Sequence, residues 1–263
     1  MARPEGRATR GKTAPNRLRR IDHFVGRYAS GLLRSPGRAP AVDLGFGRLP
    51  LTTLEMAAQL RRANPALPVI GIEIDPARVE AAQAYAGPHT RFMRGGFNLP
   101  QGSTPARLIR AMNVLRQYPE EEALPAHQQL IDQLIPGGLL VEGTSSPFGR
   151  RIVINLIRHG AGGVPVMEGL LFSTNFREGF SPDLFPPVLP KQLIHRHVPG
   201  EAIHTFFETW RRCADRARHA RTFGVRQHFV QTARDLAMTY PGVSTRPRLL
   251  RQGFLFWRRP PYG

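Results

Sequence analysis

Short apolar runs alternate with helix-forming segments over the first 145 residues of the chain. The run Ala41–Leu44 ends at a glycine, and a second run, Val69 to Asp75, follows after a helix-forming segment. Two strands joined by a helix in this way form a βαβ unit. Further runs that predict strands in the same alternation lie at 91–93, 108–112 and 139–143.

Capping residues and apolar spacing predict the helices around these strands. From Asn16, which can act as an N-cap, apolar residues recur at helical spacing and predict a helix that ends before Gly37. The segment Thr52-Thr53-Leu54-Glu55 has the spacing of a capping box and predicts that the next helix opens at Thr52. Asp75 before Pro76 predicts an N-cap with proline in the first turn.

The pattern changes after residue 146. Runs at 152–157 and 169–174, separated by a glycine-rich loop, predict an antiparallel pair of strands. Residues 201–239 predict one or two helices with a break near Gly224, and 253–258 predicts a last, antiparallel strand. Leu193-Ile194-His195-Arg196-His197 has strand spacing.

The ends of the first two strands carry the candidate chemistry. Gly45 and Gly47 lack a Cβ, so the backbone there can lie close to a ligand above the strand ends. Glu73 ends the second strand, where a carboxylate can accept hydrogen bonds from both ribose hydroxyls. Pro50 stands where the dinucleotide fingerprint has its third glycine, which disfavours NAD and FAD.

Residues 41–145 resemble the class I S-adenosylmethionine-dependent methyltransferases, and the residues that match the motifs of that family are Asp43, Gly45, Gly47 and Glu73. The resemblance implies an α/β fold with a Rossmann-like seven-stranded sheet, helices on both faces and a C-terminal antiparallel and helical addition. It implies S-adenosyl-L-methionine as cofactor, with Asp43 at the methionine amino group. The implied cofactor residues are Asp43, Gly45, Phe46, Gly47, Glu73, Ile74, Gly96, Phe97 and Asn113.

These patterns divide the chain into three parts. Residues 1–15 are a basic tail too poor in apolar residues to fold, 16–145 form the first helix and cofactor-binding core, and 146–263 complete the sheet and carry a substrate lobe. In many members of the family a leading helix lies beside the cofactor cleft. Tyr28 is expected to pack in the core, with a place beside that cleft as the alternative.

Catalytic residues are not identified by the sequence, and the weak candidates are Asn113, His195 and His197. Asn113 is not followed by the two prolines and aromatic of aminomethyltransferases, which disfavours their mechanism. Cys213 lies in a helical stretch rather than near the cofactor, so a thiolate nucleophile is disfavoured as well. The two histidines lack a third ligand nearby, and no metal site is predicted.

Charge leaves two interpretations open. The net charge is +18, and residues 201–263 carry twelve basic side chains against four acidic ones. Such patches attract RNA, so RNA is a possible partner through the arginine-rich ends. Lys12 and Lys191 are the only lysines among 37 basic residues, and biased codon usage can produce the same excess of arginine.

The chain has no run of eighteen apolar residues and no secretory signal, so we expect a cytoplasmic protein that does not enter membranes. Cys213 is the only cysteine, which excludes an intrachain disulfide. The favoured function is methyl transfer from S-adenosylmethionine to an unknown acceptor, RNA or a small molecule. The alternative is a non-catalytic, basic RNA-binding protein on a methyltransferase-like scaffold.

Overall fold

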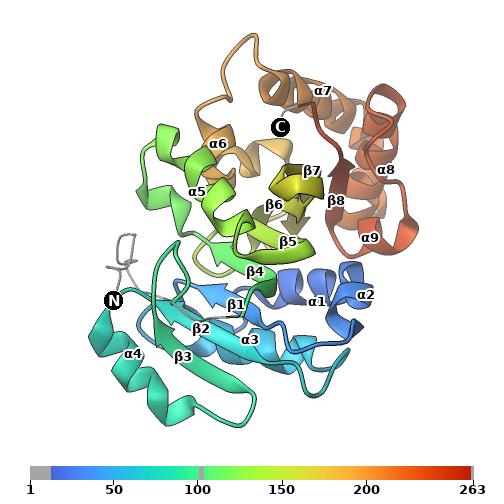
Figure 1. The fold of residues 1–263 in the computed structure, drawn as a ribbon. Helices are drawn as coiled ribbons and strands as arrows, with labels where there is room; N and C mark the ends of the chain where they lie inside the picture. Colours follow the sequence, from blue (N-terminus) through green and yellow to red (C-terminus); the bar gives the residue numbers. More distant parts are fainter. Residues whose placement is uncertain (1–12, 101–103, 262–263) are drawn as a thin grey trace.

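One mixed sheet, whose strands lie between residues 41 and 258, forms the centre of the described structure. The computed structural model describes residues 13–100 and 104–261, so most of the predicted basic tail lies outside it. The strands follow the order β3-β2-β1-β4-β5-β6-β7-β8 across the sheet (Figure 1). Their bounds are β1 Ala41–Leu44, β2 Val69–Glu73, β3 Thr90–Arg94, β4 Ala106–Met112, β5 Leu134–Ser145, β6 Arg151–His159, β7 Pro165–Thr174 and β8 Phe254–Arg258.

The first five strands form the parallel half of the sheet. Strand β1 pairs with β2 on one side and with β4 on the other, both in parallel. The chain therefore adds β2 and β3 on one side of β1 and then returns to add β4 and β5 on the other side. The carboxyl ends of β1 and β4 lie next to each other at this change of direction, which is where ligands bind in open α/β sheets.

The last three strands are antiparallel to their neighbours. Strand β6 pairs with β5, β7 with β6, and β8 with β7, all in antiparallel register. In Figure 1 this half lies above the parallel strands β1 to β3. The antiparallel pair and the last strand predicted from the sequence are confirmed, and the sheet has eight strands where the family resemblance implied seven.

Helices cover both faces of the sheet. On one face α1 and α3 pack with residues of β1, β4 and β5 in a single apolar cluster. On the other face α5 packs over the parallel strands, and α7 and α8 pack over the antiparallel ones through a cluster rich in aromatic residues. Helix bounds are α1 Arg19–Tyr28, α2 Ser30–Arg34, α3 Leu51–Leu60, α4 Pro76–Ala82, α5 Ala123–Ile131, α6 Lys191–Ile194, α7 Ala202–Arg216, α8 Val225–Thr239 and α9 Pro247–Arg251.

Three local predictions are wrong. The first helix, α1, begins at Arg19 with Leu18 at its N-cap, and not with Asn16 there. Helix α3 begins at Leu51 with Pro50 at its N-cap, because the hydroxyls of Thr52 and Thr53 hydrogen bond to Asp43 instead of capping the helix. The segment with strand spacing at 193–197 starts inside α6, and His195 is the C-cap of that helix. The N-cap at Asp75 is confirmed, since its carboxylate accepts the amide hydrogen of Ala77 at 2.9 Å.

Candidate functional site

The glycine loop lies directly after β1, at the change of direction in the sheet. Gly45 and Gly47 have φ of +74° and +82°, in the left-handed region that other residues adopt at a cost of roughly 1–2 kcal/mol. The Gly45 amide donates to the carbonyl of Ile72 on β2 at 2.7 Å. Phe46 is buried between them and packs edge-on against Phe92, with ring centroids 5.5 Å apart. Phe46 therefore anchors the loop on the α4 side.

Glu73 ties the end of β2 to this loop. Its Oε2 accepts the amide hydrogen of Gly47 at 2.8 Å, and its Oε1 accepts that of Ile74 at 3.0 Å. Arg78 on α4 brings Nη1 to 3.7 Å from Oε2. These donors explain how a carboxylate only 1% exposed is accommodated. The two predicted cofactor-binding segments are thus hydrogen bonded to each other.

Asp43 lies behind the loop in a buried network. Its Oδ2 accepts hydrogen bonds from the hydroxyls of Thr52 and Thr53, each at 2.8 Å. Its Oδ1 is 2.9 Å from Nη2 of Arg110 on β4, and Arg110 also pairs with Asp22 on α1. Asp43 therefore holds the first turn of α3 and the neighbouring strand in place. No sequence pattern pointed to Arg110 and Asp22, because their pairing depends on how α1 lies over the sheet.

Burial changes the acid-base behaviour of this network. Burial raises the pKa of Asp22 to about 6, against the opposing effect of Arg110. The pKa of Arg110 is raised as well, because Asp22 and Asp43 outweigh the lowering effect of burial. Arg110 thus stays charged throughout the physiological range, while Asp22 titrates near its lower end.

Two carboxylate oxygens close to this network have no hydrogen-bond partner among the described residues. They are Oδ2 of Asp22 and Oε2 of Glu55, and both are buried. Glu55 lies on α3, one turn after the start of that helix at Leu51. Its other oxygen accepts the Asn16 amide hydrogen at 2.6 Å. Unpartnered buried acceptors are costly unless a donor from outside the described chain satisfies them.

Asn113 follows β4 and lies at the same edge of the sheet. It adopts a φ of +61°, and its Oδ1 accepts the Ser145 amide hydrogen at 3.0 Å. Its Nδ2 lies 3.2 Å from Oγ of Ser145, and Nε of Arg17 lies 2.7 Å from that same oxygen. The segment before α1 and the ends of β4 and β5 therefore meet at Ser145.

The remaining predicted cofactor residues follow β2 and β3. Ile74 is half-buried, and Gly96 is buried next to Phe97. Phe97 lies against Tyr118 with ring centroids 4.9 Å apart, and its carbonyl accepts a hydrogen bond from Gln133. This turn is therefore held from the α5 side of the sheet.

The histidine candidates lie in the segment that joins α6 to α7. His195 is exposed, with Nδ1 3.9 Å from Glu120. His197 packs against Phe207, and burial, followed by the nearby Arg211 and His204, lowers its pKa. Within the described ranges neither histidine has a hydrogen bond or ring contact to Asn113, Glu73 or the glycine loop.

Tyr28 lies near the opposite edge of the sheet. Its hydroxyl donates to Glu168 at 2.7 Å, and its ring packs against Phe24 and Phe256. Since Glu168 lies beside Gly169, which pairs with the last residue of β8, this contact is distant from the glycine loop. Core packing is confirmed for Tyr28, and the alternative beside the cleft is wrong.

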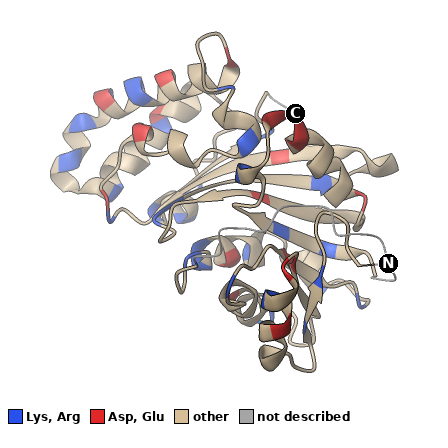
Figure 2. Ribbon diagram, turned by 90° about the vertical axis from the view of Figure 1, so that its left-hand side faces the viewer, with Lys and Arg blue, Asp and Glu red and all other residues tan. Residues whose placement is uncertain are grey.

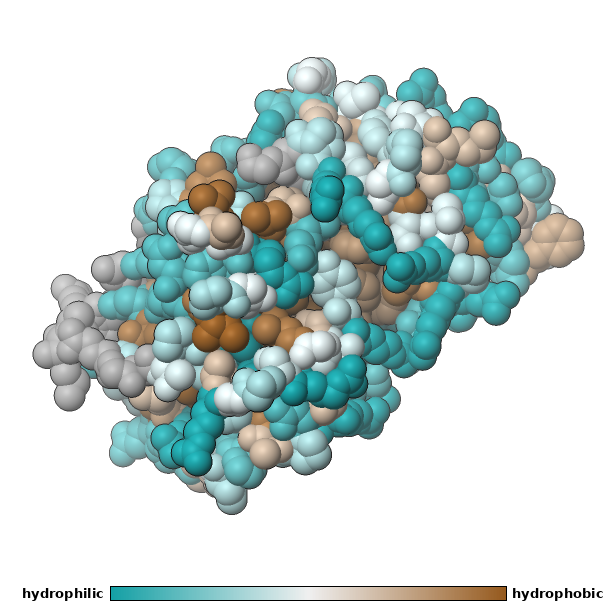
Figure 3. All heavy atoms as spheres, turned by 45° about the vertical axis from the view of Figure 1, so that its right-hand side comes forward, coloured by the Kyte–Doolittle hydropathy of each residue, from teal (hydrophilic) through white to brown (hydrophobic). Residues whose placement is uncertain are grey.

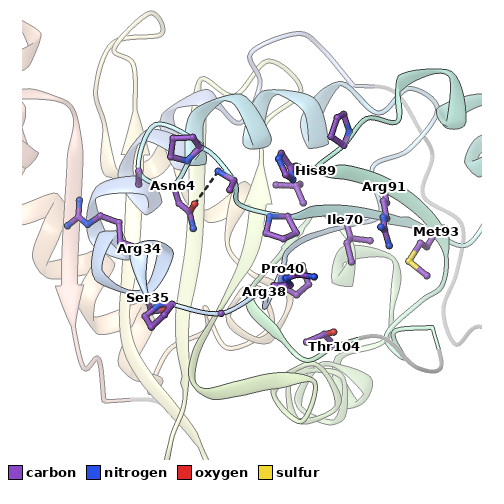
Figure 4. Close-up of a pocket in the computed structure, with 18 residues that line it drawn as sticks. Arg34, Ser35, Arg38, Pro40, Asn64, Ile70, His89, Arg91, Met93 and Thr104 are labelled. Carbon is purple, nitrogen blue, oxygen red and sulfur yellow. Dashed lines mark hydrogen bonds between the residues drawn. The ribbon is translucent and has the colours of Figure 1, made fainter.

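A cavity of about 1060 Å³ opens near the amino ends of β2 and β3 (Figure 4). Its lining includes Arg34, Asn64 and His89, and it includes none of the predicted cofactor residues. Ligands of open α/β sheets bind at the carboxyl ends of the strands. This cavity is therefore separate from the candidate site. In the described part of the chain no cluster of His, Cys, Asp and Glu could hold a metal ion, and no helix is long and apolar enough to cross a membrane.

Comparisons with known proteins were made for the sequence and for the fold. No protein-family model and no curated protein sequence matches the chain. Among solved structures, the plantazolicin methyltransferase BpumL in complex with SAH is similar, with a TM-score of 0.38 and 14% identity over 50% of this chain and 48% of BpumL. The CcbJ methyltransferase from Streptomyces caelestis has a TM-score of 0.36 and 19% identity over 59% of this chain and 71% of its own.

A third similar structure is a putative protein-L-isoaspartate O-methyltransferase from Plasmodium falciparum in complex with S-adenosyl-L-homocysteine. It has a TM-score of 0.35 and 16% identity, over 55% of this chain and 67% of its own. The chain spans about half the length of BpumL. These three neighbours are methyltransferases, or a putative one in the last case. By its own strand order the sheet of this chain is Rossmann-like, with a parallel core and antiparallel C-terminal strands.

Proposed function

We propose that the chain binds S-adenosyl-L-methionine and transfers its methyl group to an acceptor. The observation that carries the proposal is the hydrogen bond between Glu73 and the amide of Gly47. It joins the carboxylate at the end of β2 to a glycine loop in the left-handed conformation, at the change of direction in the sheet, and this combination supports the binding of a ribose. A nucleoside with a small polar tail fits this combination.

The residues around the loop suit the separate parts of this cofactor. Glu73 is the candidate acceptor for the ribose hydroxyls, because each carboxylate oxygen can accept more than one hydrogen bond. Gly96 and Phe97 are the candidates for the adenine. The unpartnered oxygens of Asp22 and Glu55 are acceptors of the kind that the methionine ammonium group needs. In this proposal Asp43 acts through the first turn of α3 and through Arg110, whose donors occupy its oxygens.

The acceptor would lie over Asn113 and Ser145. Glu73 and the glycine loop would hold the cofactor beside this edge of the sheet, where it would supply an electrophilic methyl group. The Asn113–Ser145–Arg17 contacts fix polar groups at this edge before any acceptor arrives. Orientation of this kind lowers the barrier without a covalent intermediate.

Calorimetric titration of S-adenosylhomocysteine into the wild type and into Glu73→Ala tests the proposal. Loss of hydrogen bonds to a charged acceptor costs about 1.5–3 kcal/mol, so the variant should bind roughly ten- to a hundredfold more weakly. The matched control is Glu80→Ala, which removes an exposed carboxylate from the adjacent helix α4 and should leave the affinity unchanged. Wild-type protein that binds no S-adenosylhomocysteine would overturn the proposal.

A further inference from the structure

A groove of about 880 Å³ runs beside the candidate site, between α1 and the C-terminal helices. Seven arginines line it: three from α1, two from the segments that follow β5 and β7, and one each from α8 and α9. Among the described residues that line it there is no aspartate or glutamate. Figure 3 brings this side of the molecule forward and shows hydrophilic residues over most of it.

Most of this positive charge is not neutralised by the described residues. Arg150 pairs with Glu178 at 3.0 Å, just outside the groove. Arg27 and Arg226 hydrogen bond only to neutral oxygens, those of the Gln252 side chain and the Arg251 carbonyl. The Arg19 and Arg177 side chains form no hydrogen bond or ion pair within the described ranges. The groove therefore presents guanidinium groups that can donate to a ligand.

The crowding of like charges is visible in two neighbouring pKa values. Burial and then the charge of Arg226 lower the pKa of Arg20 to about 10. The pKa of His23 is lowered by burial and by surrounding arginines, of which Arg19 has the largest effect. Folding thus holds cations together against their mutual repulsion, and an anionic ligand would relieve it.

Aromatic rings stand among the arginines. Phe148 is 67% exposed, and the guanidinium carbon of Arg150 lies 5.6 Å from the centre of its ring. Phe176 has the guanidinium carbon of Arg226 at 5.5 Å from its ring centre. Phe176 is half-buried against Phe229, so Phe148 is the exposed ring of the two. An exposed ring beside cationic side chains is the arrangement on which an unpaired base stacks while the phosphates contact the cations.

The groove extends at both ends. Arg226 and Arg251 also line a hollow of about 490 Å³ that includes Phe223, which is 74% exposed. At the other end Asn16 and Gly149 line the groove, and the adjoining Arg17 donates to Ser145 in the candidate site. A Cβ on Gly149 would lie 1.8 Å from the Arg17 carbonyl oxygen, so these two segments are in close contact. This end of the groove therefore lies next to the segment that contacts Ser145.

We propose that this groove binds single-stranded nucleic acid, with its arginines on the phosphates and Phe148 against a base. Nucleic acid is then the acceptor class of the methyl transfer, and this second step alone rests on the proposed function. Phosphates spaced along a flexible strand match cations spread over α1, two loops, α8 and α9. A single small anion would leave most of them without a partner.

Fluorescence anisotropy of a labelled single-stranded oligouridylate with the full chain tests the groove. The reversals Arg19→Glu and Arg177→Glu together should weaken binding at least roughly tenfold. They should also reduce the slope of log affinity against log salt by about 1.4, because each phosphate of a single strand that an arginine neutralises adds about 0.7 to that slope. Phe148→Ala should weaken binding roughly fivefold or more, since stacking contributes beyond charge.

The control is the double reversal Arg38→Glu and Arg91→Glu, which changes the net charge equally at exposed positions of the cavity in Figure 4. Groove binding predicts a much smaller effect from this control. Equal weakening by both pairs, or heparin binding that is as sensitive to Phe148→Ala as oligouridylate binding, would overturn the proposal. A DNA strand of matching length distinguishes the two kinds of nucleic acid. Because the assay contains no cofactor, its failure is distinct from a failure to bind S-adenosylhomocysteine.

Discussion

Nη2 of Arg110 on β4 lies 2.9 Å from Oδ1 of Asp43 on β1, and both side chains are almost completely buried. The same guanidinium pairs with Asp22 on α1, so one cation links two strands and a helix beneath the glycine loop. A buried ion network tolerates the loss of a member poorly, because the groups that remain are buried without compensation. The elements on both sides of the glycine loop are therefore held by buried charges as well as by apolar packing.

Replacing Arg110 by methionine should destabilise the fold strongly. Two carboxylates would be left buried without their cation, which typically costs about 3–5 kcal/mol. Urea unfolding followed by circular dichroism measures the change. Arg91→Met, at an exposed arginine of β3, is the control and should change stability by less than about 0.5 kcal/mol. An Arg110→Met protein as stable as this control would contradict the network.

Asp22 should make the stability depend on pH. Its folded pKa of about 6 lies above the ordinary value of 3.8, so the folded state holds the proton where the unfolded state has released it. Stability from this group is complete below pH 4 and is lost as pH rises through 6. The loss is on the order of 3 kcal/mol for a shift of about two pH units.

Comparison with Asp22→Asn isolates this effect, because the amide does not titrate. Unfolding free energies of both proteins measured from pH 4 to 7 should diverge, with the wild type losing stability relative to the variant as pH rises. Parallel pH curves for the two proteins would show that Asp22 titrates normally in the fold.

The sequence was informative wherever the structure depends on local pattern. Apolar runs marked all eight strands, and glycines after β1 marked the loop at the edge of the sheet. The Thr52 cap was predicted wrongly because Asp43, nine residues earlier, competes for the same hydroxyl. That competition depends on a tertiary contact, which capping rules do not include.

Long-range contacts explain the other omissions. Arg110 and Asp22 are 88 residues apart, and no local pattern links the two positions. The arginine groove joins α1 to α8 and α9, at opposite ends of the chain (Figure 2 shows the positive residues spread over both halves). Charge counts indicate both ends of the chain, and the fold brings arginines of α1 onto one surface with Arg226 and Arg251.

Gly47→Ala should weaken both the fold and cofactor binding. A side chain at a φ of +82° costs about 1–2 kcal/mol, and relaxation of the loop would also move the amide that donates to Glu73. Gly31→Ala is the control: Gly31 lies in α2 with open space around its Cβ position, and alanine there should stabilise the protein by about 0.4–1 kcal/mol. Opposite shifts of the two midpoints in urea are expected. A Gly47→Ala protein that matches the wild type in both stability and S-adenosylhomocysteine affinity would contradict this role of the loop.

Asn113 allows a structural role to be separated from a direct one. Both glycine and alanine lose the Ser145 hydrogen bonds, but the φ of +61° suits glycine and strains alanine. Unfolding in urea should therefore rank the proteins wild type, Asn113→Gly and Asn113→Ala, with about 1–2 kcal/mol between the two variants. Equal stability of the variants would mean that the backbone at this position relaxes without strain.

Turnover then decides what the Asn113 side chain does. If it only shapes the end of β4, Asn113→Gly should transfer labelled methyl groups to the acceptor nearly as fast as the wild type. However, Nδ2 and Oδ1 of Asn113 hydrogen bond to Ser145 at the edge of the sheet where the acceptor is proposed to lie. We therefore expect a folded Asn113→Gly protein with near-normal S-adenosylhomocysteine affinity and a reduced kcat. A loss confined to cofactor affinity would place Asn113 against the cofactor rather than the acceptor.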